Sequence, residues 1–282
     1  MATILDGAKL ATKIKESVRN EARQMDRGRP PHLVVVLVGE DPASQVYVRG
    51  KEKDCLECGF SQETIRLPAD VSQSQLEALI HELNTNGGVD GILCQLPLPK
   101  GISESAILQK IAPEKDVDCF HPLNVGRLAI GRPYVLPCTP AGVMRLLKEY
   151  GISVSGQHCV IIGRSNIVGK PLAQMLIQEG ATVTVCNSKT AHLDAHTRQA
   201  DILICAAGHA GLVTTGMVQH GTVVVDVGMN RNKEGKLCGD VDYEPVAQKA
   251  SFITPVPGGI GPMTRAILME NTLKAAKNTF IL

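Results

Sequence analysis

Unbroken aliphatic runs alternate along this chain with longer segments of helical periodicity. The runs HLVVVLVG at 32–39 and TVVVDVG at 222–228 show no regular alternation of apolar and polar side chains. Strands of this kind are buried on both faces, as in a parallel sheet covered by helices. Because tryptophan is absent and aromatic residues make up only 3% of the chain, aliphatic side chains must fill the core. The sequence therefore predicts an α/β fold.

The alternating segments form two series, which suits a chain of 282 residues with two domains. The elements predicted for the first series are helices at about 7–26, 43–58 and 72–86 and strands at 32–39, 61–67 and 89–95. A stretch rich in proline and glycine, from Pro97 to Pro140, is expected to connect the two lobes.

The second series opens with a predicted helix that has Thr139 as its N-cap and Pro140 at its first position. The further predicted elements are a helix at about 169–179, strands at 158–163, 181–186, 201–208 and 222–228, a loop at 253–263 and a last helix ending near Lys277. We place the domains at 1–120 and 121–282, with the C-terminal helix at about 264–282 packing back on the first domain.

Charge and composition favour a small-molecule partner. The 29 basic and 28 acidic residues are mixed along the chain, which leaves no field to bind nucleic acid or a membrane. No run of about 18 apolar residues is present, and Asp6 and Lys9 interrupt the N-terminus where a signal peptide would be apolar. We therefore expect a cytoplasmic protein.

The nine cysteines are interpreted as reduced thiols that serve as small core residues. Cys55 and Cys58 form a C-x-x-C, but they fall at the end of a predicted helix, whereas reactive thiols of that motif occupy helix N-termini. The histidines show no ligand spacing, so no metal is expected.

A glycine turn between a strand and a helix predicts a dinucleotide site. Gly163 closes the strand at 158–163, GRSNIVG spans 163–169, and an amphipathic helix follows, so backbone N–H groups should face an anion. The match to G-x-G-x-x-G is imperfect, and a purely structural turn is the alternative.

The residues after the next strand favour NADP over NAD. An NAD site would end this strand in Asp or Glu, but here Asn187, Ser188 and Lys189 follow Cys186. Ser188, Lys189 and Arg164 can donate charge-assisted hydrogen bonds to a 2′-phosphate. A solvated surface position remains the alternative for Lys189.

A polar stripe marks the helix at 43–58. Ser44, Tyr47 and Lys51 share one helical face, which is either a catalytic surface or an ordinary solvent face. Gln95 favours the first alternative, because it ends a predicted buried strand where open α/β sheets place their ligands. Asp116 and Asp118, in KDVDCFHP, could bind N–H groups of a heterocycle or only cap a turn.

Five motifs in order, over about residues 3–277, resemble the bifunctional methylenetetrahydrofolate dehydrogenase/methenyltetrahydrofolate cyclohydrolase family. They are DPAS-x-x-YV-x-x-K at 41–51, GIL-x-QLPLP at 91–99, P-x-KDVD at 113–118, GRSNIVGKP at 163–171 and PVPGGIGPMT at 255–264.

The resemblance implies an N-terminal folate-binding catalytic domain, a C-terminal Rossmann-like NADP domain and an active-site cleft between them. It implies NADP-dependent oxidation of 5,10-methylenetetrahydrofolate to the methenyl form, then hydrolysis to 10-formyltetrahydrofolate. The resemblance further implies a place for this one-carbon chemistry in purine, methionine and histidine biosynthesis. Family members are typically homodimers.

The resemblance also implies the site residues. The catalytic set is Lys51, Tyr47, Gln95, Asp118 and Ser44. The cofactor-binding set is Gly163, Arg164, Ser165, Val168, Gly169, Ser188, Met229 and Thr264. The substrate-binding set is Tyr47, Gln95, Leu96, Asp118, Pro257, Gly258 and Gly259.

The chain departs from the family pattern at a few positions. Cys119 follows Asp118 where the family generally has glycine, so a side chain could restrict the loop that carries this acid. Met229 and Cys94 replace other apolar residues and should matter little.

Two other functions are considered. One is a different two-lobed NADP dehydrogenase with a Lys/Asp pair, similar to shikimate dehydrogenase, against which Tyr47 and Gln95 argue. The other is a catalytically silent nucleotide-binding protein, which the set of Lys51, Tyr47, Gln95 and Asp118 disfavours.

Overall fold

The computed structural model describes residues 1–278 and 280, with the side chain of residue 43 excepted. The chain forms two compact units, which we call the three-stranded unit (12–136 and 265–282) and the six-stranded unit (1–11 and 137–264). Residues 279, 281 and 282 of the expected C-terminal range lie outside the described residues.

The units differ from the expected boundary after residue 120 in two respects. The first residues belong with the second half of the chain, because β1 (Thr3–Ile4) pairs in parallel with β11 (Phe252–Ile253). Residues 121–136 stay with the first half, where Tyr134 and Val135 pack against Cys119.

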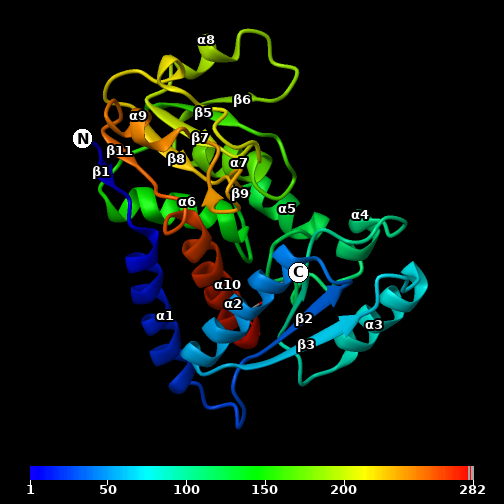
Figure 1. The fold of residues 1–282 in the computed structure, drawn as a ribbon. Helices are drawn as coiled ribbons and strands as arrows, with labels where there is room; N and C mark the ends of the chain where they lie inside the picture. The colour runs from blue at the N-terminus through cyan, green and yellow to red at the C-terminus, as the bar shows by residue number, and fades with distance from the viewer. Residues whose placement is uncertain (279, 281–282) are drawn as a thin grey trace. The chain divides into compact units, whose positions relative to one another are not determined.

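The three-stranded unit is built on parallel strands in the order β3-β2-β4. Figure 1 shows β2 and β3 running side by side with α3 next to them. Its elements are β2 (His32–Val38), β3 (Ser61–Leu67), β4 (Gly91–Cys94), α1 (Gly7–Arg23, which begins in the other unit), α2 (Pro42–Cys58), α3 (Gln73–Thr85), α4 (Glu104–Leu108), α5 (Pro122–Ala129) and most of α10 (Ile260–Ala276). Valines of β2 and leucines of α3 share one aliphatic core, as the unbroken run at 32–39 predicts.

The six-stranded unit has the parallel order β1-β11-β8-β7-β5-β6. Its remaining elements are β5 (His158–Ile162), β6 (Thr182–Cys186), β7 (Ile202–Cys205), β8 (Val223–Asp226), the antiparallel pair β9 (Asn230–Arg231) and β10 (Leu237–Cys238), α6 (Cys138–Glu149), α7 (Gly169–Gln178), α8 (Leu193–Thr197), α9 (Tyr243–Ala247) and the 3₁₀ turn η1 (Thr215–Met217). The central strands β5, β7 and β8 are buried along almost their whole length.

Two local predictions are wrong. The helix α6 begins at Cys138 with Pro137 in the cap position and no side-chain cap, because the Thr139 hydroxyl lies 2.9 Å from that of Thr264 instead. The proline-rich stretch from 97 to 140 is more than a connection, since it contains α4 and α5.

The nine cysteines, all in the described part of the chain, are free thiols, and eight of them are buried. Burial raises the pKa of Cys58 to about 12, which fits the prediction that it is a core residue rather than a reactive thiol. Across residues 1–278 and 280, no helix combines the length and apolar character needed to cross a membrane.

Candidate active site

The helix α2 holds Lys51 in a fixed and buried position. Asp41 caps the helix by accepting the N–H of Ser44 at 2.7 Å, and Gly59 ends it in the left-handed conformation. Between these ends Lys51 is only 9% exposed, and its Nζ donates to Gln95 Oε1 at 2.8 Å. An amine with little access to water and a neutral acceptor is suited to exchange a proton.

Gln95 is itself held by the sheet. Its backbone N–H donates to Val36 O at 2.9 Å, which continues the β2–β4 pairing by one residue. Its Nε2 donates to Leu96 O at 2.7 Å, which turns Oε1 toward Lys51. The side-chain amide of Gln95 therefore presents its oxygen as an acceptor to Lys51. Leu96 takes part through its backbone carbonyl group, which holds the amide in this orientation.

The polar stripe of α2 is largely removed from solvent. Ser44 and Lys51 are buried and Tyr47 is half-buried, so the solvated-face alternative for this stripe is wrong. Burial raises the pKa of the Tyr47 phenol, although the nearby charge of Arg265 opposes the shift, and the phenol stays protonated at neutral pH.

The two aspartates of KDVDCFHP have different surroundings. Asp116 is buried and accepts the N–H of Phe120 at 3.1 Å, the N–H of His121 at 2.8 Å and Asn124 Nδ2 at 2.9 Å. Its carboxylate therefore organises the loop. Burial raises the pKa of the Cys94 thiol, at the end of β4, to about 12, and the negative charges of Glu104 and Asp118 add to this shift.

Cys119 keeps the backbone conformation for which glycine is usual. Its φ is 62°, in the left-handed region, and its buried Sγ donates to Val135 O at 3.3 Å. His121, the next polar residue, caps α5 by accepting the N–H of Leu123, so its imidazole stabilises the start of this helix.

The glycine turn at 163–169 is tight enough to exclude side chains. Gly163 has a φ of 129°, and a Cβ there would collide with the carbonyl oxygen of Ala206. A Cβ on Gly169 would collide with the carbonyl oxygen of Gly163. Ser165 Oγ accepts the N–H groups of Val168 at 3.1 Å and Gly169 at 3.4 Å, which caps the start of α7. The turn thus has the close packing that a phosphate loop requires.

The carboxyl ends of the central strands meet at one edge of the six-stranded sheet. Ile162 is in register with Cys186 and Cys205, and Cys205 with Asp226. Because β6 and β7 lie on opposite sides of β5, the chain reverses its winding here, at the point where open α/β sheets bind ligands.

The predicted cofactor residues project from this edge. Arg164, Ser165, Ser188 and Met229 are exposed on the loops that follow β5, β6 and β8. The turn after β6 is closed by Asn187, whose N–H donates to Thr190 Oγ1 and whose Oδ1 accepts the N–H of Lys189. No carboxylate occurs at 187–190, so the turn fits a 2′-phosphate.

The remaining predicted residues also lie in the six-stranded unit. Thr264 Oγ1 donates to Ile260 O at 3.1 Å in the first turn of α10. Gly258 O accepts the N–H of Ala8, and the Gly259 N–H donates to Pro255 O, so the loop at 257–259 is held by backbone hydrogen bonds. The predicted substrate residues are thus divided between the units, with Tyr47, Gln95, Leu96 and Asp118 in the three-stranded one.

Sequence analysis missed a pair of buried aspartates. Asp226, at the end of β8, accepts the N–H groups of Gly228, Asp240 and Val241. Asp240 accepts three consecutive backbone N–H groups, of residues 207–209, and also Asn230 Nδ2. Glycine at 228 and 239 is the only signal, because a Cβ at either position would meet one of these carboxylates.

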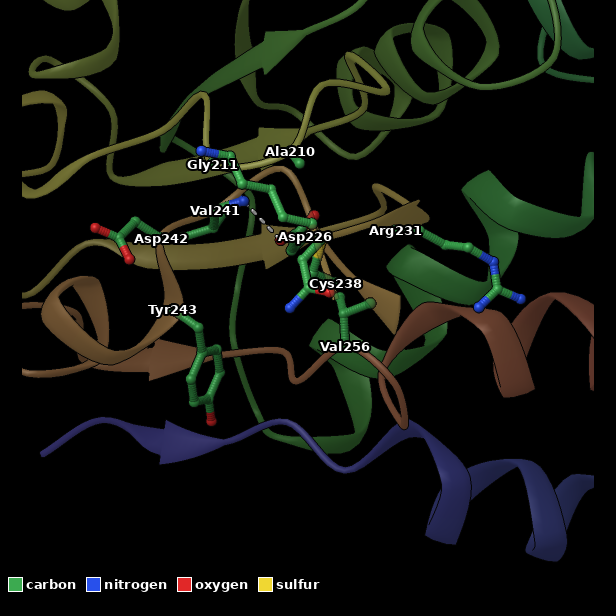
Figure 2. A pocket seen from close by; sticks show the side chains of 12 residues that line it. Ala210, Gly211, Asp226, Arg231, Cys238, Val241, Asp242, Tyr243 and Val256 are labelled. Atoms are coloured by element: carbon green, nitrogen blue, oxygen red, sulfur yellow. Dashed lines mark hydrogen bonds between the residues drawn. The ribbon is translucent and has the colours of Figure 1, made fainter. Parts of the chain in front are cut away.

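Asp226 also lines a pocket of about 460 Å³ in the same unit. Figure 2 shows Asp226 at its centre, with Arg231 on one side and Tyr243 on the other. None of the residues that line the pocket is a predicted site residue, and Val256, which lines it, directly precedes Pro257.

Comparisons with known proteins agree with this architecture. Residues 5–118 match the family model "Tetrahydrofolate dehydrogenase/cyclohydrolase, catalytic domain", and residues 137–280 match "Tetrahydrofolate dehydrogenase/cyclohydrolase, NAD(P)-binding domain". The chain is 55% identical over 276 residues to the bifunctional protein FolD of Campylobacter hominis, which covers 98% of this chain and 97% of the relative.

Two solved structures are similar throughout. The bifunctional FolD dehydrogenase/cyclohydrolase of Campylobacter jejuni has a TM-score of 0.96 and 51% identity, with 99% of this chain and 100% of that chain covered. The Trypanosoma brucei methylenetetrahydrofolate dehydrogenase-cyclohydrolase, complexed with NADP and an inhibitor, has a TM-score of 0.95 and 40% identity, with 99% and 98% covered.

Proposed function

Because this chain belongs to the tetrahydrofolate dehydrogenase/cyclohydrolase family, we propose that Lys51, held by Gln95, moves the protons of its hydrolytic reaction. The enzyme oxidises 5,10-methylenetetrahydrofolate with NADP and hydrolyses the methenyl product to 10-formyltetrahydrofolate. The observation that supports the role of Lys51 is the 2.8 Å contact of a nearly buried ammonium with a neutral amide oxygen.

In the dehydrogenase reaction the chemistry that bound NADP would supply is a hydride acceptor for the one-carbon bridge of the substrate. The folate nitrogens stabilise the resulting cation, so the protein has mainly to position its substrate. We assign this positioning to Tyr47, Gln95, Leu96 and Asp118, with Pro257, Gly258 and Gly259 as further substrate contacts. Ser44 lies on the same face of α2, one turn before Tyr47 and two turns before Lys51.

In the cyclohydrolase reaction water attacks the methenyl carbon, and the tetrahedral adduct then opens. A neutral Lys51 accepts a proton from the attacking water and returns it to the leaving nitrogen. Gln95 Oε1 orients the amine, because the hydrogen bond to Leu96 prevents the amide from turning. Asp118, beside the end of β4, accepts N–H groups of the pterin.

Cofactor residues are assigned to the part of NADP that their backbone or side chain can bind. Gly163, Ser165, Val168 and Gly169 form the turn that approaches the pyrophosphate. Arg164 and Ser188 bind the 2′-phosphate. Met229 and Thr264 complete the cofactor-binding set that the family resemblance implies.

The family resemblance further suggests a cytoplasmic homodimer. Multi-angle light scattering on the purified enzyme should give about twice the chain mass of 30.1 kDa. A mass equal to one chain would remove the dimer from the proposal.

The test of Lys51 is a paired assay of Lys51→Met and wild type. We expect loss of methenyltetrahydrofolate hydrolysis by at least about a hundredfold, since a positioned proton-transfer group contributes on that order. The matched control is Lys53→Met on the same helix, whose side chain is 76% exposed, and it should leave both activities unchanged. Near wild-type hydrolysis by Lys51→Met would disprove the assignment.

A further inference from the structure

Arg265 lies against the helix that carries Tyr47 and Lys51. It follows the first turn of α10, and its guanidinium covers the backbone of α2 at Gly50. A Cβ at position 50 would collide with Arg265 Nη1. The glycine inside α2 therefore allows the close approach of this cation, although glycine is a poorer residue than alanine in a helix interior.

The arginine is fixed from behind by a buried acid. Its Nε lies 3.2 Å from Asp54 Oδ2, as an ion pair without hydrogen-bond alignment. Asp54 also accepts from Lys15 Nζ at 2.7 Å, and Lys15 pairs with Glu57 as well. Lys15 thus forms ion pairs with two carboxylates, those of Asp54 and Glu57, whereas Arg265 forms an ion pair with Asp54.

The two terminal amino groups of Arg265 remain available. Within residues 1–278 and 280, Nη1 and Nη2 donate no hydrogen bond, and the side chain is 30% exposed. A guanidinium held by Nε, with both amino groups open, matches the two oxygens of a carboxylate.

The position of Arg265 around α2 relates it to the candidate active site. At 3.6 residues per turn, Lys51 and Gly50 lie about 40° and about 60° from Tyr47, in opposite directions. Lys51 reaches toward Gln95 on one flank of Tyr47, and Arg265 covers the other. The charge of Arg265 is close enough to act on the Tyr47 phenol.

The folate substrate has a matching order of groups. A pterin stands at one end, the one-carbon bridge and benzoyl ring follow, and a glutamyl group with carboxylates ends the molecule. If Lys51 acts at the bridge and Gln95 and Asp118 flank the pterin, the benzoyl ring passes Tyr47 and the glutamyl group reaches the opposite flank. We propose that Arg265 binds a carboxylate of the substrate's glutamyl group, an inference that rests on the proposed role of Lys51.

The test compares two substrates in the NADPH-forming assay: methylenetetrahydrofolate and the corresponding pteroate, which lacks the glutamyl group. For Arg265→Gln we expect KM for the glutamyl substrate to rise about three- to tenfold with kcat within about twofold, as for a partly exposed charged pair. KM for the pteroate should stay unchanged. Arg265→Lys should lose less, because it keeps the charge.

Two further variants separate binding from folding. Gly50→Ala should displace the guanidinium without removing its charge, and should show the same selective rise in KM while α2 gains helix propensity. Arg49→Gln removes an exposed cation from the same helix and should change neither KM. Should Arg265→Gln not fold, Gly50→Ala still decides the question.

Equal changes for both substrates would reduce Arg265 to a support of α2 through Asp54, and no change for either would remove it from the substrate site. Both results overturn the proposal. They are distinguishable from a failure of Lys51, because the Lys51→Met test measures the rate of hydrolysis and this one measures a ratio of KM values.

Discussion

Cys119 shows how a single side chain can make an unfavourable backbone conformation tenable. The left-handed region costs a residue with a Cβ about 1–2 kcal/mol, and glycine would avoid this cost. The buried thiol offsets part of this conformational free energy through its hydrogen bond to Val135 O and its packing with Tyr134 and Val135. The loop that carries Asp118 therefore keeps a glycine-like backbone without glycine.

This balance can be measured with two substitutions. Cys119→Gly releases the backbone cost but loses the buried thiol, so its free energy of unfolding should stay within about 1 kcal/mol of wild type. Cys119→Ala keeps the cost and loses the hydrogen bond, and should be destabilised by about 1–2 kcal/mol. Urea denaturation gives both values. An alanine variant more stable than the glycine variant would contradict this account.

Arg164 is the residue on which cofactor selectivity should depend. Arg164→Ala should raise KM for NADP about tenfold or more, because a charge-assisted contact to the 2′-phosphate is lost, and should change KM for NAD little. Steady-state assays with both cofactors measure the two effects. Equal losses would remove Arg164 from the 2′-phosphate site. The same assays on Lys189→Ala decide between its two alternatives, because a selective rise in KM for NADP indicates phosphate binding and no change indicates a solvated position.

Among the elements, β8 ends in a buried carboxylate at the cofactor edge, that of Asp226. Asp226 links the end of β8 to the segment after β10, and Asp240 links that segment to the loop after β7. Burial raises the pKa of Asp226 to about 6, although three backbone N–H groups favour its charged form. The arrangement fixes the loops beside the cofactor edge at the cost of a buried charge near neutral pH.

This burial gives a pH dependence of defined sign. In the unfolded chain an aspartate titrates near pH 4, whereas folded Asp226 titrates at about 6, so its stabilising contribution is full below pH 4 and is lost as pH rises through 6. The free energy of unfolding of wild type relative to Asp226→Asn should therefore fall by roughly 2–3 kcal/mol between pH 4 and 7.5. Chemical denaturation at several pH values measures this difference.

The control for Asp226 is Asp242→Asn, which changes an exposed carboxylate beside the same pocket. Its stability relative to wild type should vary little over the same range. If Asp226→Asn followed the wild-type profile in parallel, the ionisation of Asp226 would not contribute to stability as described.

At the scale of the whole molecule, local sequence predicted the long elements because their periodicity lies within each segment. All of the strands predicted from aliphatic runs are present, as are the long helices. Sequence analysis missed β1, β11 and the pair β9–β10, which have two residues each and too few side chains to show a period. The short helices α4 and α5 were not predicted, because the proline and glycine residues of this stretch indicated only a connection between lobes.

In the candidate site, too, local contacts could be predicted from the sequence and long-range contacts could not. The stripe of α2 and the strand ending at Gln95 led to the contact between Lys51 and Gln95, because helical spacing and strand ends are local features. The ion pair of Asp54 with Arg265 and the loop contacts of Asp240 join residues far apart in the chain. The spacing of residues along the sequence could not predict these contacts. The roles of Asp116 and Asp118 could be separated only once hydrogen-bond partners were visible.

The pairing of β1 with β11 has a consequence for how the chain acquires its structure during synthesis. The edge strand β1 is made before the other strands of its sheet, yet the strand it pairs with emerges about 250 residues later. The three-stranded unit likewise waits for α10 near the C-terminus. Each unit therefore stays incomplete until residues up to about 276 have been made, so a contiguous piece ending at residue 120 would lack elements of the three-stranded unit and would contain only one strand of the six-stranded sheet.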